Sequence, residues 1–323
     1  MPHSLDIATL GGQTMGTTWS VKLVVPRHHD LYPLHAGIQQ VLDTVVAQMS
    51  TWEPDSDISR YNRAEAGSWH RLPAEFGEVM QAALEVAQAS AGAFDPSVGP
   101  MVALWGFGAH AGAQRVPAPA EIDAARARSG WTRLHWRADE RALRQPGGLE
   151  LDLSGIAKGY GVDAVQRHLR TRGIASALVE VGGELYGWGS KPDGQPWRVL
   201  VESAPEEDDA SGLPPRVLAL DGLAVATSGD RWHRFDVDGQ RHSHTVDPRL
   251  GRPVERAAAA VSVIADDATR ADAWATAFTV LGPGQGIALA DAHGLAVRFL
   301  ARTAHGVSEH LSQAFARHLE PRV

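Results

Sequence analysis

The sequence has 323 residues, of which 44% are hydrophobic and 21% charged, as is usual for a soluble globular protein. With 30 basic and 38 acidic residues the net charge is −8, which argues against nucleic acid or an anionic membrane surface as the main partner. There is no cysteine, so disulfides, thiolate metal sites and cysteine nucleophiles are excluded. Any metal must be held by oxygen atoms or histidine.

The N-terminal segment, MPHSLDIATLGGQTMG, has neither the basic region nor the apolar run of a signal peptide. No stretch approaches the roughly 18 consecutive apolar residues of a membrane span. We therefore expect no membrane span and a cytoplasmic location for the chain as given. A leader removed from the sequence would leave a periplasmic location open.

Periodicity predicts a strand over residues 17–25 and an amphipathic helix over 35–49, followed by a second helix over 75–90. The polar segment 50–63, STWEPDSDISRYNR, is expected to be a surface loop. Trp52 lies within this segment, where an aromatic side chain either plugs the edge of the core or stacks on a ligand.

The segment 94–108, FDPSVGPMVALWGFG, combines turns at its proline residues with aromatic side chains near its end. Trp105, Gly106 and Phe107 place flat side chains beside backbone that a ligand can approach, although packing at the core edge also explains Trp105. Residues 109–120 form a low-complexity loop, the best candidate for a flexible flap. The next expected elements are a helix over 121–129 and strands over 132–136 and 143–145.

An apolar run breaks at Ser154 and Gly155 within residues 151–165, LDLSGIAKGYGVDAV, and a helix follows. The first N–H groups of a helix have no intrahelical partner, which suits a phosphate, and Lys158 adds a positive charge one turn in. The alternative is a tight glycine turn with a solvated Lys158, because the spacing matches neither a P-loop nor a GxGxxG fingerprint.

The rest of the chain is rich in short strands. Gly182 and Gly183 mark a hairpin turn, a bulge or a place where a ligand lies against bare backbone. Strands are predicted over 177–181, 185–188, 198–202, 217–220, 223–227, 261–265 and 295–301, and helices over 157–173, 266–282 and 308–318.

Asp272 and Thr276 are four residues apart on the predicted helix 266–282, so their oxygen atoms share one face. A carboxylate, a hydroxyl and a backbone carbonyl suit Mg²⁺ with phosphate oxygens completing its shell, and the Gly155 carbonyl is a candidate third ligand. The alternative is that Thr276 bonds back to its own helix and Asp272 is solvated.

His242, His244 and Asp247 form the densest histidine site, and acid–base chemistry suits it better than zinc. A histidine beside a ligand phosphate can take a proton from an attacking hydroxyl, whereas the alternative is a surface histidine before a turn. Ser228, within TSGD at 227–230, offers a hydroxyl next to bare backbone, which is a weak signal by itself.

Taken together and in order, eight motifs resemble the ApbE-type FAD:protein FMN transferases. They are TMGTTW (14–19), DSDISRYN (55–62), FDPSVGPMVALWGFG (94–108), LDLSGIAKGYGVD (151–163), VEVGGELYGWG (179–189), ATSGD (226–230), HTVDPRLGRPV (244–254) and ADAWATA (271–277). The resemblance implies one α+β domain of the tunnelling-fold type over 1–323, with mixed sheets flanked by helices and FAD in a cleft between them. It also implies Mg²⁺ at the pyrophosphate, transfer of FMN to a threonine or serine of a target flavoprotein, and release of AMP.

The resemblance further implies roles for individual residues. Asp272, Thr276 and the Gly155 carbonyl would be magnesium ligands, and His244 would be catalytic, alone or with Asp247 acting through it. The implied FAD contacts are Met15, Trp52, Trp105, Gly106, Phe107, Asp152, Lys158, Ser228 and Thr245. Two other activities remain open, a magnesium-dependent FAD pyrophosphatase that uses water in place of the hydroxyl, and a non-catalytic FAD-binding protein.

Overall fold

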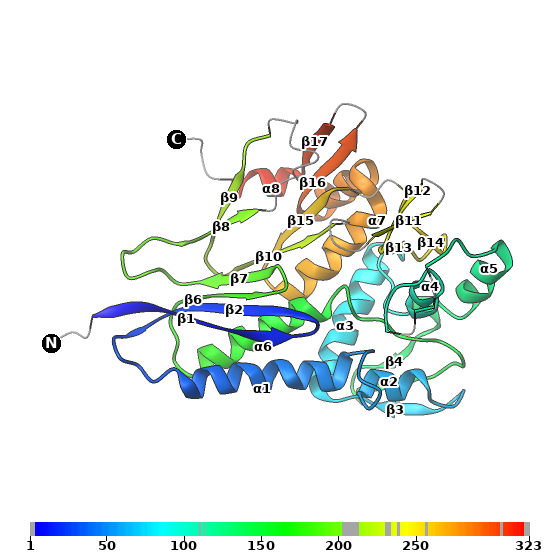
Figure 1. The fold of residues 1–323 in the computed structure, drawn as a ribbon, viewed down its shortest axis with the longest axis horizontal. Helices are drawn as coiled ribbons and strands as arrows, with labels where there is room; N and C mark the ends of the chain where they lie inside the picture. Colours follow the sequence, from blue (N-terminus) through cyan, green and yellow to red (C-terminus); the bar gives the residue numbers. More distant parts are fainter. Residues whose placement is uncertain are drawn as a thin grey trace.

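The computed structural model describes residues 4–109, 111–112, 114–201, 213–229, 234–237, 240–255, 258–303 and 306–319. The main feature of this part of the chain is a sheet of eight strands in which every neighbouring pair is antiparallel (Figure 1). In sheet order the strands are β1 (Leu5–Thr14), β2 (Thr17–Pro26), β6 (Ala177–Val181), β7 (Glu184–Trp188), β10 (Leu223–Ser228), β15 (Ala260–Ala265), β16 (Ala296–Thr303) and β17 (Gly306–Leu311).

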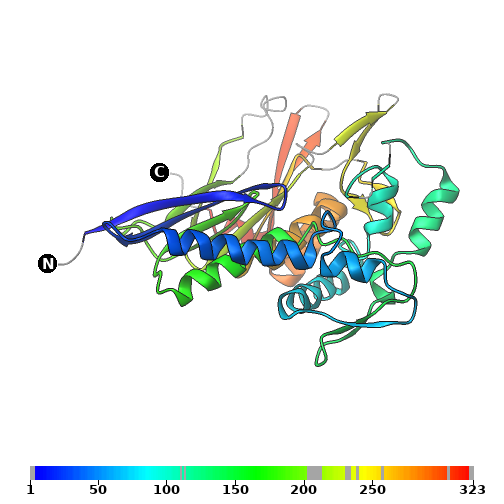
Figure 2. The same ribbon diagram turned by 60° about the horizontal axis from the view of Figure 1, so that its bottom comes forward.

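Three long helices lie along one face of this sheet (Figure 2). They are α1 (Tyr32–Met49), α6 (Ala157–Thr171) and α7 (Ala268–His293). Helix α6 packs against β6 and β7, α7 packs against β10 and β15, and the two helices contact each other. A fourth helix, α3 (Ala74–Ala89), packs against α7. The sheet therefore brings α6 and α7 together although about 100 residues separate them in the sequence.

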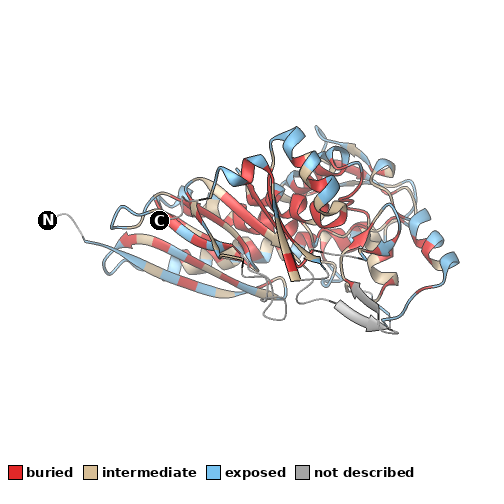
Figure 3. Ribbon diagram, turned by 90° about the horizontal axis from the view of Figure 1, so that it is seen from above, coloured by how far each residue is buried: buried red, intermediate tan, exposed pale blue. Residues whose placement is uncertain are grey.

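Alternation along the strands divides the core between the two faces of the sheet, because successive side chains of a strand point to opposite faces. Ala224 and Val263 face the helices, whereas their neighbours Val225 and Ile264 face a smaller cluster that includes Phe315. Figure 3 shows the buried residues concentrated where sheet and helices meet. The central strands of the sheet are thus covered by apolar packing on both faces.

Smaller elements surround this framework. They are the helices α2 (Asp57–Asn62), α4 (Gly99–Leu104), α5 (Pro119–Ala127) and α8 (Gln313–Ala316), a short 3₁₀ helix (Trp131–Arg133), the three-stranded sheet β3 (Trp69–Arg71), β5 (Ala142–Arg144) and β4 (His135–Arg137), and the pairs β8 (Trp197–Val201) with β9 (Arg216–Leu220), β11 (Arg234–Val237) with β12 (Gln240–Ser243), and β13 (Val246–Asp247) with β14 (Arg252–Pro253). None of the helices in the described ranges combines the length and apolarity that a membrane crossing requires.

The predicted α+β fold is confirmed, and so are most of the strands. The predicted glycine turn at Gly182 and Gly183 joins β6 to β7 as a hairpin, with φ of +59° and +102°. The helix predicted to end at Gly282 is also present. That glycine interrupts α7 with φ of +70° before the helix resumes at Pro283.

Three expectations for secondary structure need correction. Residues 50–63 contain the short helix α2, whose Ser56 cap accepts a hydrogen bond from the Ser59 backbone N–H and whose Ile58 and Tyr61 are buried. The predicted terminal helix 308–318 is wrong over its first half, because β17 pairs with β16 there. Strand β1 was not predicted, because it lies at the sheet edge and exposes most of its residues.

Candidate active site

The stretch Leu151–Gly155 leads into α6, and residues of two earlier motifs hold it in place. The Asn62 side chain donates a hydrogen bond to the Leu151 carbonyl at 3.0 Å and accepts one from the Leu151 N–H at 2.7 Å. The Asp152 N–H donates to the Pro96 carbonyl at 2.9 Å. Residues of the motifs DSDISRYN and FDPSVGP therefore hydrogen-bond to the backbone just before α6 and help to fix where α6 begins.

Helices α6 and α7 approach each other closely at Gly159, where a Cβ atom would lie 2.1 Å from the Ala268 carbonyl oxygen. The Gly159 N–H donates to Asp272 Oδ2 at 3.0 Å. One turn before Gly159, a Cβ atom on Gly155 would lie 2.7 Å from Thr276 Oγ1. The crossing therefore brings the three predicted metal ligands, Gly155, Asp272 and Thr276, to one place.

Neither local alternative for Asp272 and Thr276 describes this site. Asp272 is only 2% exposed and is therefore not a solvated side chain. The Thr276 hydroxyl makes no hydrogen bond within the described part of the chain, whereas the Thr279 hydroxyl, one turn on, donates to the Ala275 carbonyl at 2.8 Å. An oxygen atom of Thr276 is thus left available beside a buried carboxylate.

Lys158 reaches across to the β6–β7 hairpin and forms an ion pair with Glu184, with Nζ 2.5 Å from Oε1. Burial alone would lower the pKa of Lys158, but the negative charges of Asp272 and Glu184 outweigh it and raise that pKa. Lys158 is therefore a permanently charged group held by a partner, and the solvated alternative is wrong for it. Gly182 allows this contact, because a Cβ atom there would lie 3.0 Å from Lys158 Cδ.

Glu184 directly follows the predicted glycine turn at Gly182 and Gly183 but is not among the site residues predicted from the sequence. Its side chain is 3% exposed, and its Oε2 has no hydrogen-bond partner among the described residues. Burial raises the pKa of Glu184, and the Lys158 ammonium opposes that rise. Burial likewise raises the pKa of Asp272, against the charge of Lys158 and the Gly159 N–H.

The β1–β2 turn reaches α6 beside these residues. Met15 occupies this turn with φ of +47°, a conformation that few residues other than glycine adopt. Its terminal methyl lies 2.9 Å from where a Cβ atom of Gly161 would be. The predicted FAD contact Met15 therefore lies within one turn of Lys158 along α6.

A second group of predicted residues lies in two loops, residues 105–107 and 244–251, which together we call the rim. The rings of Phe107 and His244 meet edge to face with centroids 6.4 Å apart. Trp105 Nε1 donates to the Gly251 carbonyl at 2.9 Å, so the two loops lie side by side. The Trp105 side chain is 3% exposed, as the packing alternative expects, whereas Trp52 is 69% exposed and does not plug the core.

The remaining predicted residues have the following surroundings. The Asp247 carboxylate is engaged by Arg249, whose backbone N–H, Nε and Nη2 donate to it at 2.8–2.9 Å. Asp152 accepts from the Ser154 N–H at 2.8 Å. Gly106 joins Trp105 to Phe107 and has a φ of +81°. Ser228 is the last residue of β10. The Thr245 carbonyl accepts a hydrogen bond from the Val254 N–H. The side chain of His242 and all of Asp230 lie outside the described residues.

The described residues contain no cluster of three or more histidine, aspartate or glutamate side chains that could hold a metal. A metal at the α6–α7 crossing would therefore depend on one carboxylate together with hydroxyl and carbonyl oxygens. Such neutral oxygen donors are what hard divalent ions accept from proteins.

Comparisons with known proteins agree with the motifs. A model of the ApbE family matches residues 15–299. The FAD:protein FMN transferase of Vibrio cholerae is 36% identical over 95% of this chain and 91% of that protein, and that of Salmonella typhimurium is 34% identical over 95% and 87%. The apo crystal structure of the Pseudomonas stutzeri flavinyl transferase ApbE has a TM-score of 0.90 and 38% identity over 99% of this chain and 98% of that one. The chain belongs to the ApbE family.

Proposed function

We propose that this protein is an FAD:protein FMN transferase that depends on Mg²⁺ and releases AMP. The observation that carries the proposal is the meeting of Asp272, Thr276 and Gly155 at the α6–α7 crossing, next to the Lys158 ammonium. Relatives at 34–36% identity over nearly the whole chain bear the name FAD:protein FMN transferase. FAD is accordingly the expected substrate, and a flavoprotein with an accessible threonine or serine is the expected acceptor.

The donor set at the crossing suits magnesium. Asp272 supplies a carboxylate, Thr276 a hydroxyl that makes no hydrogen bond to the described residues, and Gly155 a carbonyl, all of them hard oxygen ligands. Lys158, Glu184 and Asp272 together carry one negative charge when all are ionised, which favours binding of a cation. When bound, the ion would neutralise pyrophosphate charge and polarise a phosphoryl oxygen.

Other groups of the chain would bind and orient FAD. The Lys158 ammonium, near the start of α6, can hold negative phosphate oxygens at the end of the helix that favours anions. Trp52, at 69% exposure, offers a flat apolar face on which an aromatic ring system can stack. The other proposed FAD contacts are Met15, Phe107, Asp152, Ser228, Thr245, Trp105 and Gly106.

His244 is the proposed base for the transfer. The acceptor hydroxyl oxygen attacks the phosphorus next to FMN, the bond from that phosphorus to the bridging oxygen breaks, and AMP leaves with that oxygen. The hydroxyl proton passes to an imidazole nitrogen of His244, which Phe107 steadies through edge-to-face contact. Asp247 is the proposed support for the loop that carries His244, since Arg249 occupies its carboxylate.

The decisive experiment is to incubate the protein with FAD, Mg²⁺ and a flavoprotein domain that carries an acceptor threonine. Mass spectrometry should then detect a covalent FMN adduct on that domain, together with stoichiometric AMP. Free FMN and AMP without an adduct would indicate a pyrophosphatase instead. FAD binding without AMP release at any Mg²⁺ concentration would indicate a carrier, and either result would overturn the proposal.

A further inference from the structure

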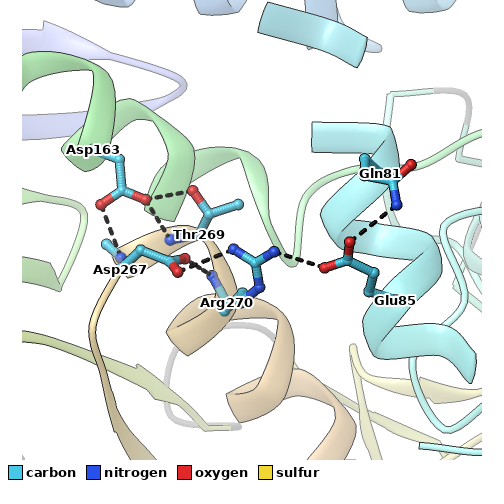
Figure 4. Close-up of polar contacts among 7 residues, drawn as sticks. Gln81, Glu85, Asp163, Asp267, Thr269 and Arg270 are labelled. Carbon is cyan, nitrogen blue, oxygen red and sulfur yellow. Dashed lines mark hydrogen bonds and ion pairs between the residues drawn. The ribbon is translucent and has the colours of Figure 1, made fainter. Parts of the chain in front are cut away.

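Helix α7 carries two of the proposed metal ligands, and its first turn is held by a side chain from another helix. Asp163 of α6 accepts hydrogen bonds from the Ala268 N–H at 2.9 Å, the Thr269 N–H at 2.9 Å and the Thr269 hydroxyl at 2.5 Å. Its carboxylate is 6% exposed. Figure 4 shows Asp163 pointing directly at the start of α7.

These bonds complete the set of partners for the first turn of α7. The first four N–H groups of a helix have no intrahelical acceptor and need one from outside. Asp267 serves as the local cap and accepts from the Arg270 N–H at 2.7 Å, while Asp163 supplies acceptors for two of the remaining groups. Asp163 therefore does for α7 what a capping residue does, but from a different helix.

Asp163 and Gly159 attach the two helices at two points that are one turn apart on each helix. Gly159 on α6 faces Asp272 on α7, and Asp163, four residues later, faces Ala268, four residues earlier. Two attachments one turn apart oppose sliding and turning of α7 relative to α6, in addition to the packing of α7 against β10 and β15. A slide of one residue would move α7 by about 1.5 Å along its axis, so these attachments help to fix its register.

We propose that Asp163 is a positioning residue for the metal site, which sets the position of Asp272 and Thr276 relative to the Gly155 carbonyl. The inference rests on the proposed magnesium site and names a residue that controls it without touching the ion. Metal ligands that are misplaced by a fraction of their bond length bind more weakly, and outer partners of ligands typically change metal affinity by about 10- to 100-fold.

The same helix start offers a matched control. On its exposed side, Arg270 forms an ion pair with Glu85 of α3 at 2.6 Å, and Glu85 also accepts from Gln81 (Figure 4). Both partners of the Arg270–Glu85 pair are about 45% exposed. Exposed ion pairs of this kind contribute little to stability, so the Arg270–Glu85 pair should not set the register of α7 against α6.

The experiment compares Asp163→Asn with Glu85→Gln, using Mn²⁺ alone as a stand-in for Mg²⁺ and counting free Mn²⁺ by electron paramagnetic resonance. Asparagine keeps the volume but turns an N–H₂ group toward backbone donors. We expect Asp163→Asn to weaken Mn²⁺ binding at least about 10-fold and to raise the Mg²⁺ concentration for half-maximal AMP release by a similar factor. Glu85→Gln should stay within about twofold of the unsubstituted protein by the same comparison.

Two outcomes would overturn the inference while leaving the magnesium site intact. One is wild-type Mn²⁺ affinity in Asp163→Asn with only a lower unfolding temperature, which would make the residue purely structural. The other is equal weakening in both variants. If Asp163→Asn does not fold, Thr269→Val removes one of the three bonds and should still weaken Mn²⁺ binding; unchanged binding would count against the proposal. Absence of Mn²⁺ binding in the unsubstituted protein would contradict the metal site itself, and with it any positioning role.

Discussion

The α6–α7 crossing and the rim formed by residues 105–107 and 244–251 belong to one proposed site but are built differently. At the crossing, Asp272 is 2% exposed, and helix backbone approaches so closely that only glycine fits at position 159. At the rim, the contact between Phe107 and His244 is made by loop residues, and the nearby Leu250 is 61% exposed. One region is fixed by packed helices and the other is open to a partner.

This difference matches the two tasks of the proposed reaction. Binding a cation and a pyrophosphate needs charged groups held rigidly and away from water, where their interactions are strong. Accepting a side chain from another protein needs an accessible surface. Changes at the crossing should therefore affect metal binding and all AMP release, whereas changes at the rim should separate FAD binding from transfer.

The largest expected effect comes from Asp272→Ala at the crossing. Loss of the only buried carboxylate among the proposed ligands should lower AMP release by at least about 10³-fold, several kcal/mol of transition-state stabilisation. The protein should remain folded, since a buried carboxylate with a raised pKa is costly to keep. Chromatographic measurement of AMP tests this, with Thr279→Val on the same helix as the control. Full activity of Asp272→Ala with Mg²⁺ present would contradict the proposed site.

At the rim, His244→Ala should lower the rate of FMN transfer by about 10²- to 10³-fold, because a general base contributes on this scale. The affinity for FAD should change little, since the proposed role concerns the acceptor hydroxyl. Transfer is measured by mass spectrometry of the acceptor domain, and FAD affinity by fluorescence titration. A normal rate of FMN transfer in His244→Ala would show that His244 is not the base. Loss of FAD affinity in this variant would show that His244 binds FAD instead.

Gly159→Ala tests the close approach at the crossing. The new methyl group would meet the Ala268 carbonyl oxygen, a backbone atom that cannot rotate away. Overpacking of this kind costs about 1–3 kcal/mol of the free energy of unfolding, to be measured by urea denaturation. Gly284→Ala, in α7 and with open space around it, should be neutral. Equal stability of both variants would show that the crossing is looser than described.

The smallest effect is expected for Trp52→Ala. Loss of a stacking face should weaken FAD binding by about 1 kcal/mol, near the lower end for base–aromatic stacking, or roughly fivefold. Stability should not change, since the side chain is 69% exposed. Trp69→Ala is the matched control, because Trp69 is also exposed and instead packs under the Arg137 guanidinium. Equal FAD affinity in the two variants would count against stacking at Trp52.

Local patterns were enough to predict the helix starting near Gly155, the Asp272–Thr276 pair and most strands. Helical spacing by itself placed Asp272 and Thr276 on one face. The pattern failed for residues 308–311, which are strand because β16 supplies a partner for their backbone. It also failed for α2, whose buried Ile58 and Tyr61 lie among polar residues in the sequence. In both cases the deciding contact is distant in the sequence.

The sequence by itself determined the family through the order of its motifs, and the family implied the α+β class. It also predicted Asp272, Thr276 and the Gly155 carbonyl as metal ligands, because that prediction depends on residue types and on spacing within single elements. Only the tertiary structure decided that Glu184 is the partner of Lys158, that Asp163 holds the start of α7, and that Arg249 occupies Asp247. The first two contacts join residues that are 26 and 106 positions apart. Such pairs depend on how the sheet places α6 next to α7 and next to the β6–β7 hairpin, and no local pattern contains that information.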